Sequence, residues 1–427
     1  MKPTHTIRSI LAAVAFSFSC QTMATPVTSM VVLGDSLSDN GNTTHLLKAL
    51  RQEESPAYLV HPVKAFVINK MTEYANYYYI PQMVLDAGIQ VVTNYLDYDV
   101  APYLAELVGR IRDVPILPGK PYWHDHFTNG EVWNEYLAEM FQIDAYDEEV
   151  YLNRAFAGSW ALTYDYQLTT WNLIRHPVAS LKNLVVGKLI PPSLGLITQA
   201  HLLENDTLDN DAVYFIFAGA NDYISMLNFE DNYDVSIRST YIDNVLDAIE
   251  SSTTHLIAQG ASHFVIMGLP DVSLSPRFTT TADKVILKDT VDEHNKRLEA
   301  RLVQWQAAHP DVDYMYVDIS SSLKTILAEP AEHGLTNTKD ACIDVKLPKF
   351  KALARSPFPH NSVLQYAQVV QYVSPKWAAG AKNYHECKAP NEYLFWDEIH
   401  PSTKVHKLLA KDVCDAMKAH GYEVECR

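Results

Sequence analysis

The strongest candidate for a reactive group is the serine in Gly34-Asp35-Ser36-Leu37-Ser38-Asp39, directly after the apolar residues 30–33. A serine that follows a buried strand and stands beside glycine lies on a tight turn at the carboxyl edge of a sheet, where its hydroxyl is exposed. Its own backbone N–H can then point at a developing oxyanion. The alternative is an ordinary strand-to-helix turn in which Ser36 or Ser38 caps the helix.

A matching base and acid occur near the C-terminus, in Asp397-Glu398-Ile399-His400-Pro401. A serine hydroxyl is a weak nucleophile until a base removes its proton, and histidine ordinarily titrates near the working pH of such a base. Asp397 precedes His400 by three residues, so its carboxylate can return to the other imidazole nitrogen and fix the tautomer. A lone pair with this spacing is more often a surface histidine beside an acid.

Two further stretches supply groups that could stabilise negative charge. Asn221 follows an apolar run and could present its side-chain amide, and Gly158 ends the run 153–158 and could offer a backbone N–H. Each is weak alone, because asparagine and glycine are common turn residues. Together the four stretches predict an acyl-transfer site with a nucleophile, a base, an orienting acid and three oxyanion donors. These donors are the N–H groups of Ser36 and Gly158 and the Asn221 amide.

The elements that must position these groups alternate between strands and helices. Short β-branched or aromatic runs, each ending in a turn signal, predict strands, and longer segments between them predict helices. Ser402 is expected to cap one further helix that runs to about Lys418. Runs buried on both faces predict an α/β fold, in which helices cover both faces of a parallel sheet and polar residues collect at the strand ends. The expected strands are 30–33, 213–217, 264–267 and 314–317, and the expected helices include 240–258 and 291–308.

Three segments look like insertions in that core. Residues 45–120 and 160–200 are rich in aromatic side chains, and residues 343–386 lie between Cys342 and Cys387. We find no linker, so we expect one domain over residues 25–427 with these insertions.

The N-terminus and the charge predict export. Residues 1–24 combine a short basic region, a short apolar run and a small-residue cleavage site, which is the pattern of a secretory signal peptide. A lipoprotein anchor at Cys20 fits less well. Removing these residues takes away two basic groups and no acidic one, so the formal charge moves from −17 to −19. So acidic a chain is a poor candidate for nucleic-acid binding.

Cysteine use also suits an exported protein. After loss of the leader, four cysteines remain, an even number that suggests two disulfides. Four cysteines allow three pairings, of which we prefer the sequential one. A zinc site is weaker, because no Cys-x-x-Cys spacing occurs, and we expect no metal and no cofactor. The preferred pairs are Cys342–Cys387 and Cys414–Cys426.

Four blocks in this order, GDSLSDN, NRAFAGS, AGAND and DEIH, resemble the SGNH/GDSL hydrolase family. The stretches 127–133 and 268–271 agree with further family segments, and the resemblance runs with interruptions from about residue 29 to 419. It implies a three-layer, flavodoxin-like α/β fold. The family's serine, glycine and asparagine match Ser36, Gly158 and Asn221, and its last pair matches Asp397 and His400. Ala157 departs from the pattern, because many relatives carry a second glycine there.

Within the family, the chain resembles secreted bacterial phospholipases A and glycerophospholipid:cholesterol acyltransferases. This resemblance implies a secreted enzyme that passes through the periplasm, releases fatty acid from phospholipid or lysophospholipid and transfers acyl groups to a sterol. It also implies a disulfide loop that an activating protease nicks. Residues 343–386 carry a net charge of +4 with interleaved aromatic residues, which suits peripheral contact with a membrane surface or a lid over Ser36. The alternative without a functional role is that residues 343–386 form a solvated insert packed on the body of the protein.

Two other functions use the same residues differently. A carbohydrate O-acetyl esterase of the same fold would need a more open, polar site. A non-enzymatic binding protein would have lost at least one of the candidate catalytic residues, yet all are present.

Overall fold

The computed structural model describes residues 25–45, 75–95, 118–162, 195–203, 211–227, 234–345 and 384–427, with a few isolated positions between 48 and 98. The expected signal peptide, residues 1–24, lies outside these ranges, as do most of the expected insertions at 160–200 and 343–386. The expected insertion at 45–120 is described only in part.

The centre of the protein is a five-stranded parallel sheet with the strand order β3-β2-β4-β5-β6. In this order β3, the second strand of the sheet along the chain, lies at the edge, and β2, the first, lies between β3 and β4. Flavodoxin-like folds have the same strand order. The expected α/β class is therefore confirmed. The strands are β2 (Met30–Gly34), β3 (Tyr151–Asn153), β4 (Val213–Phe217), β5 (His263–Met267) and β6 (Asp313–Val317).

Strands β2 and β4 lie inside the sheet and are covered on both faces, so neither has a polar face. Every residue of β2 and of β4 is buried, and Met30 pairs with Val213 in register. A strand covered on both faces needs such a continuous apolar run, whereas a strand with one wet face would alternate. The carboxyl ends of these two neighbours lead into Ser36 and Asn221.

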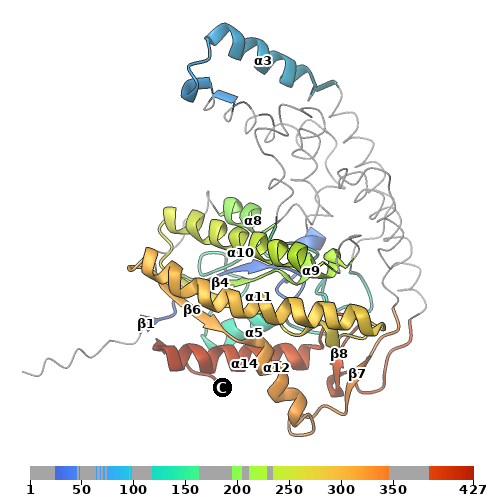
Figure 1. Cartoon of the computed structure of the whole chain (residues 1–427). Helices are drawn as coiled ribbons and strands as arrows, with labels where there is room; N and C mark the ends of the chain where they lie inside the picture. Colours follow the sequence, from blue (N-terminus) through green and yellow to red (C-terminus); the bar gives the residue numbers. More distant parts are fainter. Residues whose placement is uncertain are drawn as a thin grey trace, which may run out of the picture.

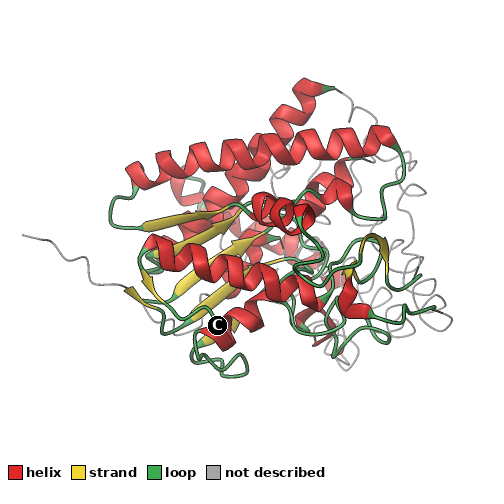
Figure 2. Cartoon of the chain, turned by 90° about the horizontal axis from the view of Figure 1, so that it is seen from below, coloured by secondary structure: helices red, strands yellow, loops and turns green. Residues whose placement is uncertain are grey.

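Helices cover both faces of the sheet (Figure 1). Figure 2, seen along another direction, shows the strands between helical layers. Side chains cap several helices: the Asp234 carboxylate accepts from the Ser236 N–H at 2.7 Å, and the Thr280 hydroxyl accepts from the Asp283 N–H at 3.1 Å. One layer contains α8 (Leu196–Leu202), α10 (Val235–Ala258) and α11 (Thr281–Ala308), and the other contains α5 (Trp133–Met140), α12 (Ile319–Ala328) and α14 (Thr403–His420).

Short elements complete the fold. Two parallel strand pairs lie outside the main sheet, β1 (Thr25–Pro26) with β9 (Tyr422–Glu423) and β7 (Asn337–Ala341) with β8 (Tyr393–Phe395). The remaining helices are α3 (Gln82–Tyr95), α9 (Ala220–Met226) and the 3-10 turns η4 (Val272–Leu274) and η6 (Pro390–Glu392). One hydrophobic core gathers buried residues from Met30 to Val424.

The four expected strands are present to within one residue at each end, and the expected helices 240–258 and 291–308 are the C-terminal parts of α10 and α11. The expectation for Ser402 is wrong in one respect. Ser402 is the N-cap residue of α14, but its hydroxyl makes no capping hydrogen bond and donates to the Tyr393 carbonyl at 2.6 Å instead. That bond ties the start of α14 to β8.

The described part of the 45–120 segment exposes large apolar side chains. Tyr77 and Tyr79 are 74% and 93% exposed, and Met83 of α3 is 82% exposed. Figure 1 draws α3 apart from the sheet layers. Among the described residues, no helix is both long and apolar enough to cross a membrane.

The structure joins Cys342 to Cys387 and Cys414 to Cys426. The second bridge ties α14 to the chain end beyond β9. Next to it, the Asp313 carboxylate at the start of β6 accepts from the Tyr422 hydroxyl at 2.7 Å and lies 2.9 Å from Nε2 of His420. Although burial raises the pKa of Asp313, hydrogen bonds from His263, Tyr422 and His420 hold it well below its ordinary value.

This cluster predicts a pH dependence of stability. Because the pKa of Asp313 is depressed in the fold, its contribution is present above the unfolded pKa of about 3.9 and is lost as the pH falls toward the lower folded value. We expect Asp313→Asn to lower the free energy of unfolding at about pH 5, with a deficit that shrinks below about pH 4. Urea denaturation of the wild type and of Asp313→Asn at several pH values measures this difference in the free energy of unfolding. A deficit that is equally large at the lowest pH would contradict this role.

Candidate active site

The turn after β2 places Ser36 at the carboxyl edge of the sheet. Gly34 can approach β4 closely because it has no side chain: a Cβ there would lie 2.6 Å from the Phe217 carbonyl oxygen. The Asp35 carbonyl then accepts from the Ser38 and Asp39 N–H groups at 3.0 Å each, which closes a tight turn around Ser36.

The structure brings Ser36, His400 and Asp397 into one hydrogen-bonded chain, although 364 residues separate Ser36 from His400. Nε2 of His400 lies 2.9 Å from the Ser36 hydroxyl, and Nδ1 lies 2.7 Å from Oδ2 of Asp397. With the imidazole proton on Nδ1, His400 donates to Asp397 and Nε2 accepts from the hydroxyl. This is the geometry that removal of the hydroxyl proton requires.

The segment from β8 to α14 holds the acid and the base. The Trp396 N–H donates to the His400 carbonyl at 2.8 Å, which folds residues 397–400 into a turn. The Thr403 N–H donates to the Asn129 side chain at 2.8 Å, and the Thr128 hydroxyl donates to the Pro401 carbonyl at 2.9 Å. The stretch 127–133 therefore fixes the chain directly after His400.

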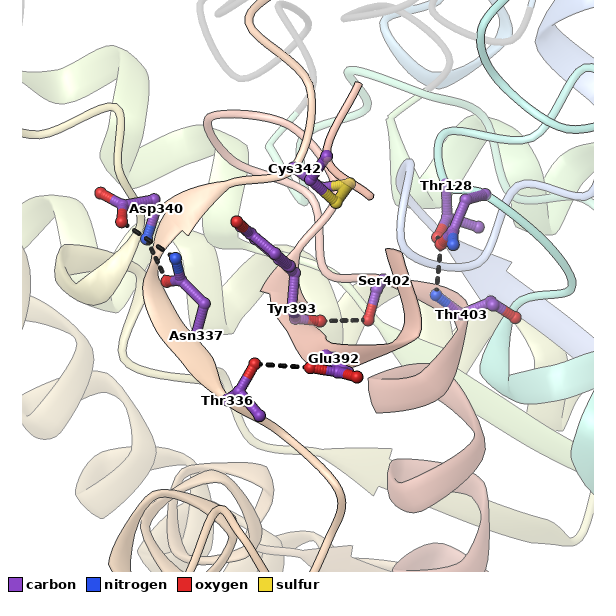
Figure 3. The surroundings of a disulfide bond; sticks show 11 residues. Thr128, Thr336, Asn337, Asp340, Cys342, Glu392, Tyr393, Ser402 and Thr403 are labelled. Atoms are coloured by element: carbon purple, nitrogen blue, oxygen red, sulfur yellow. Dashed lines mark hydrogen bonds between the residues drawn. A yellow bond between two sulfur atoms is a disulfide. The ribbon is translucent and has the colours of Figure 1, made fainter. Parts of the chain in front are cut away.

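A disulfide supports the other side of this turn. The Cys342 N–H donates to the Phe395 carbonyl at 3.0 Å, and the Ile343 N–H donates to the Trp396 carbonyl at 2.9 Å. Figure 3 shows the Cys342 bridge beside the Tyr393–Ser402 hydrogen bond. The base of the 343–386 loop thus lies directly against the strand that leads to Asp397.

The Asp397 carboxylate is fully buried and accepts hydrogen bonds at both oxygens. Oδ1 accepts from the Ile399 and His400 N–H groups at 2.8 and 2.7 Å, and Oδ2 accepts from His400 and from the Tyr122 hydroxyl, at 2.7 Å each. Burial alone would raise the pKa of Asp397, but the charge of His400 and these hydrogen bonds hold it below its ordinary value. Asp397 therefore stays ionised.

The three expected oxyanion donors differ in their surroundings. Within the described ranges, the N–H groups of Ser36 and Gly158 have no hydrogen-bond acceptor. The Asn221 amide donates to the Ser159 carbonyl at 3.0 Å and lies 3.4 Å from Oδ2 of Asp35. Gly158 takes a left-handed φ of 77°, which glycine adopts without strain. Asn221 is thus oriented by the two segments that carry Ser36 and Gly158.

Buried carboxylates tie these segments together. The Ala157 N–H donates to Oδ2 of Asp39 at 2.9 Å. Burial raises the pKa of Asp35 to about 6 and that of Asp222 to about 7, the latter despite hydrogen bonds from the N–H groups of Ala161 and Leu162.

In the described ranges, no group of acidic, histidine or cysteine residues could hold a metal ion.

Sequence reasoning missed two residues of this site. Tyr122 bonds to Asp397, which lies 275 positions away in the sequence, and no motif marks it beyond its place five residues before the stretch 127–133.

Gln199 of α8 holds the end of the strand before Ser36. Its side chain accepts from the Gly34 N–H and donates to the Gly34 carbonyl, at 2.8 Å each, and donates to the Ser159 hydroxyl at 3.1 Å. It supplies the acceptor for the Gly34 N–H beyond the end of β3, while the Gly34 carbonyl also accepts from the Phe156 N–H at 3.2 Å.

We expect Gln199→Ala to lower the free energy of unfolding by about 2–4 kcal/mol, because it leaves the buried Gly34 N–H without an acceptor and opens a small cavity. Urea denaturation measures the change. The exposed Gln259 provides the control, and Gln259→Ala should change stability by less than about 0.5 kcal/mol. Equal stability of the two variants would show that the Gln199 clamp contributes nothing.

Comparison with known proteins agrees with this arrangement. The GDSL-like lipase/acylhydrolase family matches residues 30–413. The chain is 25% identical over 308 residues to a phosphatidylcholine-sterol acyltransferase of Aeromonas hydrophila, an alignment that covers 68% of this chain and 80% of that protein. It is 24% identical over 293 residues to the thermolabile hemolysin of Vibrio parahaemolyticus, with coverage of 68% and 56%.

A third relative is the secreted effector protein SseJ of Salmonella typhimurium, 24% identical over 325 residues, with coverage of 75% of this chain and 63% of that protein. Identity to each relative is low. The family match nevertheless spans the whole central sheet and includes Ser36, Asp397 and His400, which are joined by hydrogen bonds. The protein belongs to the GDSL-like lipase/acylhydrolase family.

Proposed function

We propose that this protein is a serine lipolytic enzyme in which Ser36 forms an acyl-enzyme intermediate. The observation that carries the proposal is the hydrogen-bonded chain from Ser36 through His400 to the buried Asp397. His400 takes the hydroxyl proton through Nε2 as the Ser36 oxygen attacks the ester carbonyl carbon. It then returns that proton to the leaving alcohol.

The oxyanion of the tetrahedral intermediate is stabilised by the N–H groups of Ser36 and Gly158 and the Asn221 amide. Two of these donors have no acceptor within the described residues and are available to an oxyanion. The acyl-enzyme then reacts with a hydroxyl group that His400 deprotonates. Water gives a fatty acid, and an alcohol gives a new ester.

The proposed substrates are phospholipids and lysophospholipids, with a sterol as the acyl acceptor. The name of the Aeromonas relative supports this choice, since it joins phosphatidylcholine and sterol. The exposed Tyr77, Tyr79 and Met83 offer apolar surface for peripheral contact with a membrane. The basic and aromatic loop 343–386 is proposed to act as a lid that a protease opens, and its residues 346–383 lie outside the described residues.

We further propose one catalytic domain over residues 25–427 in a protein secreted through the periplasm. The main hydrophobic core, whose described residues run from Met30 to Val424, supports one domain. Two disulfides suit an oxidising compartment, and residues 1–24 have the pattern of a cleaved leader.

Replacing Ser36 by alanine tests the nucleophile. We expect Ser36→Ala to lower kcat for p-nitrophenyl esters by about 10⁴- to 10⁶-fold, because no attacking oxygen remains, with no loss of stability. The matched control is Ser251→Ala on the outer face of α10, which should keep full activity. Retention of most activity by Ser36→Ala would overturn the mechanism. A wild-type preference for acetyl esters over long-chain esters would favour the carbohydrate O-acetyl esterase.

Product analysis tests the acyl acceptor and the loop. Purified protein, intact or nicked within residues 343–386, is incubated with phosphatidylcholine and cholesterol, and both fatty acid and cholesteryl ester are measured. We expect cholesteryl ester mainly after nicking, because an opened lid would admit the sterol. Fatty acid alone, in equal amounts from both samples, would leave a plain phospholipase whose loop has no gating role.

A further inference from the structure

The Asp397 carboxylate has about four positions at which it can accept a hydrogen bond, and four donors fill them. Three donors come from its own turn: the Ile399 N–H, the His400 N–H and the His400 imidazole. The fourth is the Tyr122 hydroxyl, which comes from a different part of the chain and shares Oδ2 with the imidazole. Tyr122 is therefore the distant donor that acts on the same oxygen as the base.

Tyr122 is held rigidly for this contact. Its side chain is 5% exposed, and its ring packs edge-on against Trp396 at 6.4 Å and near Phe127 at 6.3 Å between centroids. The Tyr122 N–H donates to the Gly119 carbonyl at 3.0 Å. Phe127 in turn lies 5.5 Å from the His400 ring. The hydroxyl thus reaches Asp397 from a packed aromatic cluster that also borders the base.

We propose that Tyr122 is a positioning residue that sets the orientation and the charge density of Asp397 and so limits how strongly Asp397 attracts the imidazole of His400. The inference rests on the proposed function, in which His400 is the base. A donor on Oδ2 withdraws negative charge from the oxygen that faces Nδ1. The carboxylate then stabilises the imidazolium less strongly than an unshared carboxylate would.

Other charged groups act on the same pair but do not depend on Tyr122. They are Asp35 in the Ser36 turn and His406 on α14, which act on His400, and Arg277, which acts on Asp397 and lies 3.3 Å from the Glu398 carboxylate. All of these groups remain in a Tyr122→Phe protein. A difference between that variant and the wild type therefore reports the hydroxyl alone.

The test is the pH profile of kcat/KM for wild type and Tyr122→Phe. We expect the midpoint of the acidic limb to move up by about half a unit to one unit, because the hydroxyl no longer withdraws charge from Oδ2. Below that midpoint, kcat should fall by about 3- to 10-fold with little change in KM. On the alkaline plateau the loss should be smaller. A loss that is equal at every pH would reduce Tyr122 to a packing residue and overturn the proposal.

Tyr136→Phe is the matched control. The Tyr136 hydroxyl makes a hydrogen bond of 2.7 Å to the Thr403 hydroxyl, near the site but away from Asp397. This variant also removes one tyrosine hydroxyl from a packed position, and its acidic midpoint should equal that of the wild type. A shift of the same size in both variants would contradict the specific role of Tyr122.

A second readout needs no enzymatic activity. The imidazole protons of His400 can be titrated by NMR in the wild type and in Tyr122→Phe, with His400→Gln identifying the signal. We expect the titration midpoint in the variant to lie about half a unit to one unit higher. Identical midpoints would overturn the role of Tyr122 even in an active enzyme. A shifted midpoint in a protein without Ser36-dependent activity would instead reject the proposed function and leave the contact intact.

Discussion

The burial of the Asp397 charge is the constraint on which the rest of the site depends. A carboxylate with no exposed surface is unfavourable unless hydrogen bonds replace its water, and here four donors do so. Meeting that requirement fixes the 397–400 turn, the imidazole orientation and the packing of Tyr122. The neighbouring segments, 127–129 and 342–343, hold this turn from both sides.

The parallel sheet solves the second problem, which is to join residues that are far apart in the chain. Strands β2 and β4 are neighbours, so their carboxyl ends deliver Ser36 and Asn221 to the same edge. Strand β3 lies on the other side of β2 and leads into the segment that contains Gly158. An open α/β sheet places its ligands at such a switch in strand order, and the hydrogen-bonded chain from Ser36 lies there.

The sequence predicts this sheet well, because strands buried on both faces must be continuous apolar runs that end in turns. The apolar runs at 213–217 and 30–33 could therefore be predicted as strands from the sequence, and the four sequence blocks shared with the family locate Ser36 and His400. Short edge elements such as β3, with three residues, carry no such signal. Tyr122 and Gln199 were missed because a single tyrosine or glutamine gains its meaning only from a contact 165 or more positions away. The hydroxyl of Ser402 could likewise have capped α14 or bonded to β8, and sequence alone does not choose.

The central claim is that Ser36 is the residue that accepts the acyl group. The most direct measurement is mass spectrometry of peptides after treatment with a fluorophosphonate, which traps a serine activated by a neighbouring base. We expect one adduct, on the peptide that contains Ser36, with labelling slowed when an excess of ester substrate that acylates the same oxygen is present during the reaction. An adduct on another residue, or an unlabelled Ser36 in protein that hydrolyses esters, would contradict it.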